Sequence, residues 1–270
     1  MAGRDLEGPL DNGERVRLRH ELLAVRTPVR PHSRTYGYGQ AMPDETSLYD
    51  LPWVTIRRVS VTDMDNNVYL VTSKDSGAQV LIDAAGGIRK IRRMLEASSN
   101  DASERTRLSL IITTHSHHDH IRALRELVDE TGVRTAAGAA DAAAINGQTG
   151  IKPDVLLRNR DIVAVEGFDL TVIHLRGHTP GSIALAYAPV DGPVHLFTGD
   201  SLFPGGPGKV TSPVDFARIM EDLEARVFDI YGDDTVVHPG HGLPTTLGDE
   251  RPHIEEWLAR GWFTKSPESR

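Results

Sequence analysis

Short apolar and alternating segments follow one another along the chain after its first 50 residues. Each ends in Asp, Asn, Ser or Gly, which favour turns, so the pattern predicts a meander of strands. These segments are WVTIRRVSV at 53–61, NVYLVTS at 67–73 and AQVLIDA at 78–84. A helix is expected over 87–97, where Ile88, Ile91 and Leu95 recur at intervals of three and four. The continuously apolar run LSLIITT at 108–114 indicates a strand buried on both faces.

Strand-like and helix-like segments continue to alternate toward the end of the chain. We expect helices at 121–130, 141–147, about 213–228 and about 250–260, and strands at 161–165, 168–174, 183–188, 193–198 and 235–238. The chain thus divides into two similar halves, each with strands first and helices later. Two sheets packed face to face, with helices outside, would bury the apolar faces of both halves. The predicted fold is a mixed α/β (α+β) protein with a four-layer αββα sandwich.

The first 50 residues have a different character. They lack sustained periodicity, and the run RTPVRPHSRTYGYGQAMPDE at 26–45 mixes Pro, Gly, Arg and Tyr. We interpret residues 1–50 as an N-terminal extension, which acts as a lid, forms an arm between copies of a homo-oligomer, or has no part in catalysis. The main domain is expected over 51–270.

The composition excludes several classes of protein. The 270 residues include no cysteine, which rules out disulfides, iron–sulfur clusters, cysteine-type zinc fingers and a cysteine nucleophile. Thirty basic and 38 acidic residues give a net charge of −8, which opposes attraction to nucleic acid or an anionic membrane. The start of the chain lacks the apolar core of a secretory signal, and no segment approaches the ~20 apolar residues of a membrane span. We therefore expect a cytoplasmic protein that acts on a small molecule.

Ionisable side chains are concentrated directly after the buried strand, in the segment HSHHDH at 115–120. Side chains alternate in direction at the end of a strand, so His115 and His117 can point the same way. The turn that follows can direct Asp119 and His120 toward a second point. Desolvation of several neighbouring ionisable side chains is unfavourable, and packing alone does not require it. We therefore interpret the segment as contributing to two neighbouring cation sites.

Two ligands per metal are too few, and three other loop ends supply candidates. His178 lies in RGHTPGS, Asp200 in FTGDSLF and His241 in HPGHG, each after an expected strand and beside glycine. Imidazole and carboxylate groups suit zinc at ~2.0–2.2 Å and also accept iron or manganese. We therefore predict two divalent metal ions, with zinc first and iron or manganese as alternatives. The remaining histidines near these motifs are expected to be structural or supporting: His118, His174, His195 and His238.

The motifs HSHHDH, GHTPGS, TGDSLF and PGHG, in this order, resemble the metallo-β-lactamase fold superfamily, and within it the hydroxyacylglutathione hydrolases (glyoxalase II). The resemblance covers about residues 53–245 and implies an αββα sandwich with the metals at one edge. It implies that Asp200 bridges the two metals and that Asp83 supports the site from behind the ligands. The implied ligands are His115, His117 and His178 for the first metal, and Asp119, His120 and His241 for the second.

The resemblance also implies a mechanism and a substrate class. A hydroxide that bridges the metals would attack a carbonyl carbon, with Asp119 and Asp200 as catalytic carboxylates. Lys209 stands where glyoxalase II has a lysine that helps to hold glutathione, and Phe203 begins the loop expected to form one wall of the pocket. A hydroxyacyl thioester is therefore the expected substrate. Thr211 and Leu243 depart from the family pattern, and only about thirty residues follow His241, which puts recognition of glutathione itself in doubt.

Other activities are compatible with the same residues. Lactonases and phosphodiesterases of the superfamily use the same pair of metals on another electrophile. A persulfide dioxygenase would use one iron, but Lys209 and the intact pair Asp119 and His120 argue against it. A binding module without catalysis is the interpretation we favour least, because an intact polar cluster in a desolvated cleft is costly without a role.

Overall fold

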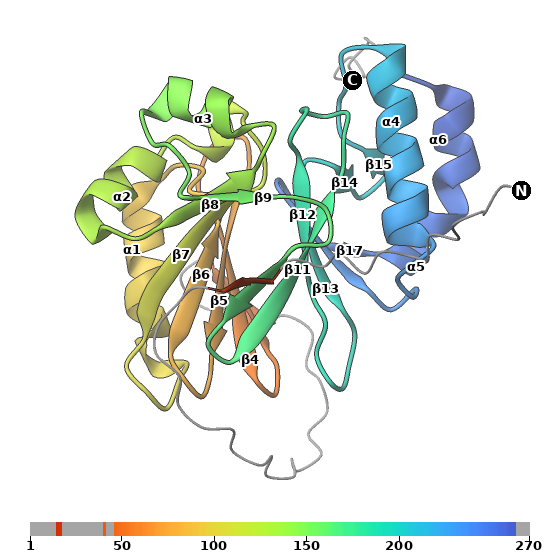
Figure 1. Cartoon of the computed structure of the whole chain (residues 1–270). Helices are drawn as coiled ribbons and strands as arrows, with labels where there is room; N and C mark the ends of the chain where they lie inside the picture. The colour runs from red at the N-terminus through yellow and green to blue at the C-terminus, as the bar shows by residue number, and fades with distance from the viewer. Residues whose placement is uncertain (1–14, 18–39, 42–45, 263–270) are drawn as a thin grey trace, which may run out of the picture.

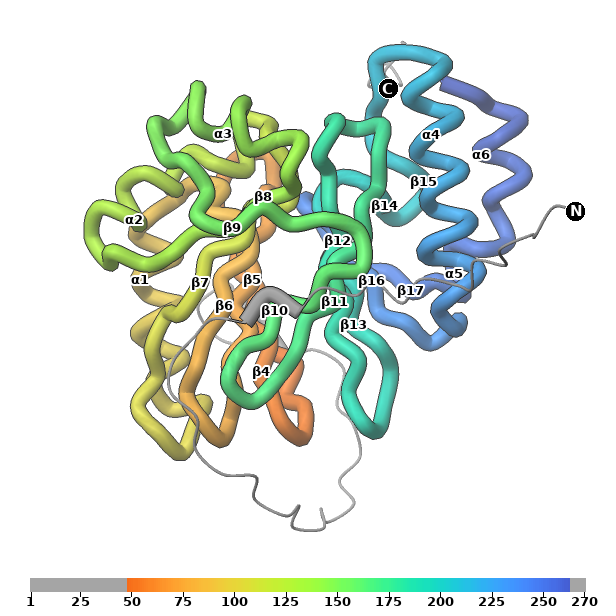
Figure 2. Tube along the Cα trace, in the orientation of Figure 1, coloured from red at the N-terminus to blue at the C-terminus, as the bar shows by residue number. Residues whose placement is uncertain are grey.

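The computed structural model describes residues 15–17, 40–41 and 46–262. Two β-sheets pack face to face, and helices cover their outer faces (Figure 1). Three helices lie on the side of the first sheet and three on the side of the second (Figure 2). The four-layer αββα sandwich predicted from the sequence is confirmed.

The first sheet has eight strands in the order β2-β3-β4-β5-β6-β7-β8-β9. Neighbours are antiparallel up to β6 and parallel from β6 to β9, so the parallel connections pass through helices on the outer face. The strands are β2 Gln40–Ala41, β3 Thr46–Asp50, β4 Val54–Ser60, β5 Asn67–Ser73, β6 Ala78–Ile82, β7 Arg107–Thr113, β8 Thr135–Gly138 and β9 Val155–Leu157. The helices are α1 Ile88–Ala97, α2 Leu124–Thr131 and α3 Ala142–Thr149, with short 3₁₀ turns at Ser98–Asn100 and His118–His120.

The second sheet has seven strands in the order β1-β10-β11-β12-β13-β16-β17. They are β1 Arg15–Arg17, β10 Ile162–Val165, β11 Phe168–His174, β12 Ile183–Tyr187, β13 His195–Gly199, β16 Val236–Pro239 and β17 Thr245–Thr246. A separate hairpin joins β14 Leu202–Phe203 to β15 Gly206–Pro207. The helices are α4 Pro213–Leu223, which continues as a π-helical turn over Glu224–Phe228, α5 Leu247–Glu250, and α6 Ile254–Arg260 after a 3₁₀ turn at Arg251–His253.

Three apolar clusters hold the four layers together. The first fills the space between the sheets and includes Ile56, Val80 and Phe197. The second lies between the first sheet and α1 to α3, and the third lies between the second sheet and α4 to α6, where Trp257 is buried. Each sheet is therefore buried on both faces, as the continuous apolar run of β7 indicated.

Some element boundaries and strands differ from expectation. The helix expected at 121–130 begins at Leu124, because the preceding residues form a 3₁₀ turn at His118–His120. The helix expected at 250–260 is divided into α5, a 3₁₀ turn and α6. Strand β8 reads TAAG and was not predicted, since Ala and Gly carry no strand signal. A Cβ on Gly138 would lie 1.9 Å from the carbonyl oxygen of Gly181, so close packing selects glycine there.

Parts of the predicted N-terminal extension contribute strands. β1 pairs in parallel with β10, and β3 pairs antiparallel with β4 along its whole length. The other residues of this segment (1–14, 18–39 and 42–45) lie outside the described residues, so a lid or dimer arm stays a prediction. None of the helices in the described ranges has the length and apolar character needed to cross a membrane.

Candidate metal centre

The predicted ligands all follow strand ends, and they come from both sheets. His115, His117, Asp119 and His120 follow β7 of the first sheet, whereas His178, Asp200 and His241 follow β11, β13 and β16 of the second. Backbone contacts join the two sheets beside them. The main-chain N–H of Ile183 donates to the carbonyl of Thr114 over 2.9 Å, and Asn66 forms an isolated β-bridge with His241.

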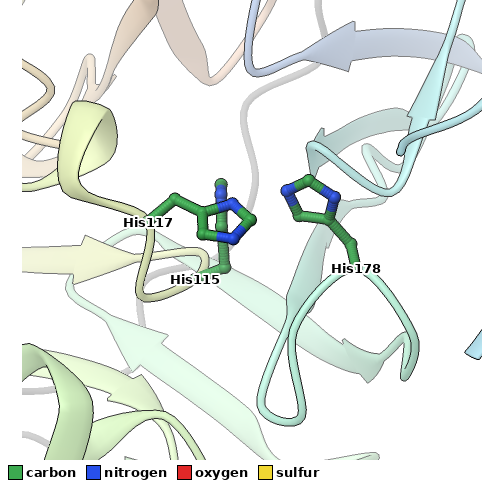
Figure 3. Close-up of side chains that lie close together, drawn as sticks. All are labelled: His115, His117 and His178. Atoms are coloured by element: carbon green, nitrogen blue, oxygen red, sulfur yellow. The ribbon is translucent and has the colours of Figure 1, made fainter. Parts of the chain in front are cut away.

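One group of candidate ligands consists of His115, His117 and His178. One ligand atom from each lies within 4.8 Å of the others, and the ring centroids are 4.5–4.9 Å apart. Figure 3 shows His115 and His117 on one loop and His178 on the loop that faces it. The structure therefore brings together the three histidines that the family resemblance assigned to a first metal.

A second group consists of Asp119, His120 and His241. Nε2 of His241 lies 3.2 Å from Oδ2 of Asp119 and 3.2 Å from Nε2 of His120. Nε2 of His120 lies 3.7 Å from the same Asp119 oxygen. These three side chains converge as expected for ligands of a second metal.

Asp200 lies between the two groups. Its Oδ2 is 3.5 Å from Nε2 of His178 and 3.4 Å from Nε2 of His241, and its Oδ1 is 3.2 Å from Nε2 of His120. One carboxylate thus contacts members of both groups, which is the position that a bridging ligand requires.

The orientation of the imidazoles fits metal binding. Nδ1 of His178 donates to the carbonyl of Lys209, and Nδ1 of His241 donates to the carbonyl of Met64, both over 2.7 Å. In the neutral form of each ring, such a bond places the proton on Nδ1 and leaves Nε2, which points inward, free to bind a metal. Nε2 of His115 and of His178 are buried and have no hydrogen-bond partner among the described residues. Such an atom costs about 1–3 kcal/mol when unsatisfied, and a cation would satisfy it.

The charges in the site are strongly coupled. Burial lowers the pKa of His115 and of His178, so both rings are neutral at pH 7. Burial works against protonation of His120 too, but the carboxylates of Asp200 and Asp83 outweigh it and raise the pKa of His120 to about 10. Burial also opposes the charged form of Asp200, yet His120 and His241 lower the pKa of its carboxyl. The site therefore holds a buried anion that positive charge stabilises.

Asp83 supports the ligands from behind. Its Oδ1 accepts from the main-chain N–H of Thr114 over 2.7 Å, and its Oδ2 accepts from Thr114 Oγ1 over 2.7 Å and from Nδ1 of His120 over 2.9 Å. Asp83 is also close to His115 and His120. These bonds tie Asp83 to His120 and to the loop after β7, and with His115 and His120 it forms a third group that has the spacing of metal ligands.

Close approach of the main chain at Gly240 shapes the centre. A Cβ on Gly240 would lie 2.1 Å from Oδ1 of Asp200 and 2.7 Å from Cε1 of His120. Only glycine fits there without moving two candidate ligands. The glycine of PGHG is therefore part of the geometry of the site.

The two residues predicted to contact substrate lie beside the centre. Phe203, on β14, is partly buried, and its ring centroid is 6.2 Å from that of His241. The side chain of Lys209 is exposed, while its main-chain carbonyl holds His178. Lys209 thus contributes through its backbone, which the sequence did not predict.

Sequence reasoning also missed Asn66. Its Nδ2 lies 3.0 Å from Oδ2 of Asp119 and 3.3 Å from Nε2 of His241, and its Oδ1 accepts from Thr62. Asn66 is fully buried, and its hydrogen bond lowers the pKa of Asp119 against the effect of burial. The only local signal was a pair of polar residues before an apolar strand, in DNNVYLV.

Arg176, the first residue of RGHTPGS, is bound to the side chain of a helix. Its guanidinium makes a two-point contact with Asp222 of α4, with 2.8 Å from Nε to Oδ2 and 2.6 Å from NH2 to Oδ1. Its main-chain N–H donates to the same carboxylate over 2.8 Å. Arg176 therefore fastens the loop that carries His178 to α4.

The other histidines are not in the ligand groups. His118 is exposed, and Nε2 of His174 contacts the carbonyl of Pro180 over 2.9 Å. His195 and His238 contact each other, with 2.9 Å between Nδ1 and Nε2, and lie buried among aromatic rings.

Known proteins share this fold and much of this sequence. The family description of the metallo-beta-lactamase superfamily matches residues 61–241. Hydroxyacylglutathione hydrolase GloC of Haemophilus influenzae is 26% identical over 213 residues, which cover 73% of this chain and 95% of that protein. A hydroxyacylglutathione hydrolase of Gloeobacter violaceus is 34% identical over 188 residues, covering 69% of this chain and 67% of that one. The crystal structure of TTHA1623 in a di-iron-bound form is 27% identical, with a TM-score of 0.53, and covers 72% of this chain and 96% of that one.

The family match agrees with the geometry of the centre. The matched residues make up more than half of the chain and include every candidate ligand from His115 to His241. The face-to-face sheets and the His and Asp groups at their edge are the features that the sequence resemblance implied. This chain belongs to the metallo-beta-lactamase superfamily.

Proposed function

We propose that the protein is a hydrolase that uses two divalent cations to cleave a thioester with water. The observation that carries this proposal is the position of Asp200, whose two oxygens lie within 3.5 Å of ring nitrogens from both ligand groups. A carboxylate placed in this way suits a bridge between two cations. The di-iron form of TTHA1623, at 27% identity, supports the same stoichiometry here.

The proposed ligands follow from the two groups. His115, His117 and His178 would hold one cation, Asp119, His120 and His241 the other, and Asp200 would contact both. Bound divalent cations would supply Lewis acidity and lower the pKa of water at the centre toward 7. Nitrogen and oxygen donors of this kind fit zinc, and also iron or manganese.

Asp119 has the properties of the group that orients the attacking water. Its side chain is partly exposed, so water can reach it, and its lowered pKa keeps it a carboxylate at neutral pH. Asn66 holds one of its oxygens through a 3.0 Å hydrogen bond. Asp119 can thus accept a proton from water while its position stays fixed.

The hydroxyacylglutathione hydrolases of Haemophilus influenzae and Gloeobacter violaceus, to which this chain is similar, support a thioester substrate. Water adds to the carbonyl carbon, the carbon–sulfur bond breaks, and a carboxylic acid and a thiol are released. The exposed ammonium group of Lys209 can reach an anionic part of the thiol carrier, because its backbone adjoins His178. Phe203, beside His241, offers an apolar contact for the acyl part.

Hydrolysis assays with a metal count test the proposal. Purified protein, with its metal content measured, is given hydroxyacyl thioesters of several thiols, a lactone, a phosphodiester and a persulfide with oxygen. We expect two metal ions per chain and turnover of at least one thioester. The variant Asp200→Ala should lose both activity and metal, whereas Asp169→Asn, at an exposed position of β11, should lose neither.

Other outcomes of the same assays would replace the proposal. Turnover of the lactone or the phosphodiester alone would reject the thioesterase and keep the dinuclear centre. One iron per chain with oxygen uptake on the persulfide would reject the hydrolase. Full activity of Asp200→Ala would reject this centre as the site of reaction.

A further inference from the structure

A buried carboxylate outside the ligand set joins the two loops of the three-histidine group. Asp141 is 1% exposed and stands at the residue before α3. Aspartate at that position ordinarily caps a helix by accepting from its first N–H groups. The side chain of Asp141 makes no such bond to α3.

The carboxylate of Asp141 accepts hydrogen bonds from both loops instead. Its Oδ2 accepts from the main-chain N–H of Ser116 over 2.8 Å and from Oγ1 of Thr179 over 2.5 Å. Its Oδ1 accepts from the main-chain N–H of Gly181 over 2.7 Å. Ser116 lies between His115 and His117, and Thr179 follows His178 directly.

We propose that Asp141 is a positioning residue that sets the separation between these two loops and thereby the metal affinity of His115, His117 and His178. The inference rests on the proposed function, because it assumes that these histidines bind a metal. The loops follow strands of different sheets, and the rings of His117 and His178 meet edge to face between them, with their centroids 4.5 Å apart (Figure 3). A carboxylate bonded to both loops fixes their separation.

Close packing leaves little freedom for another arrangement. A Cβ on Gly181 would lie 2.3 Å from the main-chain nitrogen of Asp141. On the other side, Nε2 of Gln148, on α3, donates to the carbonyl of Ser116 over 2.7 Å. Both loops are therefore held against the start of α3 through Asp141, and the loop of Ser116 is also held near the end of α3 through Gln148.

The charge of the carboxylate matters as well as its shape. A carboxylate can accept at both oxygens, whereas asparagine presents one oxygen and one NH₂ group. In Asp141→Asn the NH₂ group would face either the N–H of Gly181 or the donors Ser116 and Thr179. At least one loop would lose its bond to α3, because two donors cannot pair.

The sharpest test changes one hydroxyl. Thr179→Val removes the Oγ1 donor at nearly constant volume, and Thr179→Ser retains it. Each metal-free variant is titrated with Co²⁺, whose visible absorption reports the coordination of each binding step. His117→Ala, which removes a proposed ligand, identifies the step that belongs to the three-histidine group. Thr235→Val is the matched control, since Thr235 is equally buried and its hydroxyl has no partner in the described part of the chain.

We expect Thr179→Val and Asp141→Asn to weaken the step affected by His117→Ala by about 10–100-fold, as for other residues that orient ligands. The other step should change less than about threefold, and Thr179→Ser should bind like the wild type. The melting temperature of metal-free Thr179→Val should lie below that of Thr235→Val by roughly 3–12 °C, because Thr179→Val loses one hydrogen bond to a charged group.

Three results would overturn the inference. Wild-type affinity of Thr179→Val at both steps would show that the loops need no link through Asp141. Equal weakening of both steps would show a general structural role of Asp141 and Thr179. Failure of the wild type to bind Co²⁺ would reject the proposed function itself. This result differs from the other two, because in both of those the wild type binds Co²⁺ and only the variants change.

Discussion

Nδ1 of His120 donates a 2.9 Å hydrogen bond to Oδ2 of Asp83, a residue whose backbone has a φ of 59°. Aspartate and asparagine tolerate this left-handed conformation better than most residues. Asp83→Asn therefore keeps the backbone but removes the negative charge behind His120. We expect metal affinity to fall about 10–100-fold, measured by competition with a chromophoric chelator.

The control for this variant is Asp169→Asn, which removes an exposed carboxylate from β11. It should bind metal like the wild type. Unchanged affinity in Asp83→Asn would mean that the charge of Asp83 does not contribute to the ligand strength of His120.

Gly240→Ala should damage the centre through shape alone. The added methyl group would meet Oδ1 of Asp200 and Cε1 of His120 at distances shorter than any normal contact. Displacement of a catalytic group by about 1 Å can cost 100-fold in rate, and we expect at least that loss of hydrolysis. Gly147→Ala, in α3 and with open space around the new methyl group, should keep full activity. Full activity in Gly240→Ala would contradict the close approach of this loop to the ligands.

Removal of metal should lower both activity and stability. Dialysis against a chelator should abolish hydrolysis, and added zinc, iron or manganese should restore it. A ligand at 100 times its Kd stabilises the folded state by about 2.7 kcal/mol, which corresponds to a fall in Tm of roughly 5–10 °C on removal. Calorimetry of the same sample before and after dialysis measures it. An unchanged Tm would show that no metal was bound at the start.

The pair His195 and His238 should make the protein sensitive to acid. Burial lowers the pKa of His195 to about 4, from 6.5 in an unfolded chain, and lowers that of His238 as well. Between about pH 4 and pH 6.5, His195 binds a larger fraction of a proton in the unfolded state than in the folded state. The free energy of unfolding therefore falls as the pH falls through this range. For His195 alone the loss between pH 7.5 and pH 5 is about 2 kcal/mol.

Urea unfolding at the two pH values, in the presence of a chelator, measures this loss. The variant His195→Leu should show a smaller difference between pH 7.5 and pH 5 than the wild type. A general loss of stability in the variant does not affect the comparison, because each protein serves as its own reference. An equal difference in both proteins would assign the acid sensitivity to other groups.

Several features of the centre could be predicted because they are local in sequence. HSHHDH follows a buried strand, and His178, Asp200 and His241 follow three others, so regular strand geometry brings them to loop ends. The structure brings all seven together as the resemblance implied. Prediction of the sandwich succeeded for a similar reason, since long apolar strands carry a strong periodic signal.

Other features depend on contacts between distant segments, and no local pattern marks them. Asn66 lies 53 residues from Asp119, and Asp222 lies 46 residues from Arg176. Asp141 resembles an ordinary helix cap in the sequence, and only the folded chain shows that its carboxylate bonds to two loops. Strand β8 was missed because its residues, TAAG, carry no strand signal, and strand β9 was missed because the three residues VLL are too few to show a period.

The candidate ligands are divided between the two sheets, so metal binding can be used to detect association of the two halves of the chain. Neither half of the chain contains all three members of either ligand group, since His178 and His241 come from the second half. A cut in the turn between β9 and β10 would yield two fragments, each with part of both groups. Both three-residue groups with His178 or His241 would then be complete only on reassociation, so the Co²⁺ spectrum of the intact centre would measure how tightly the two halves of the sandwich associate.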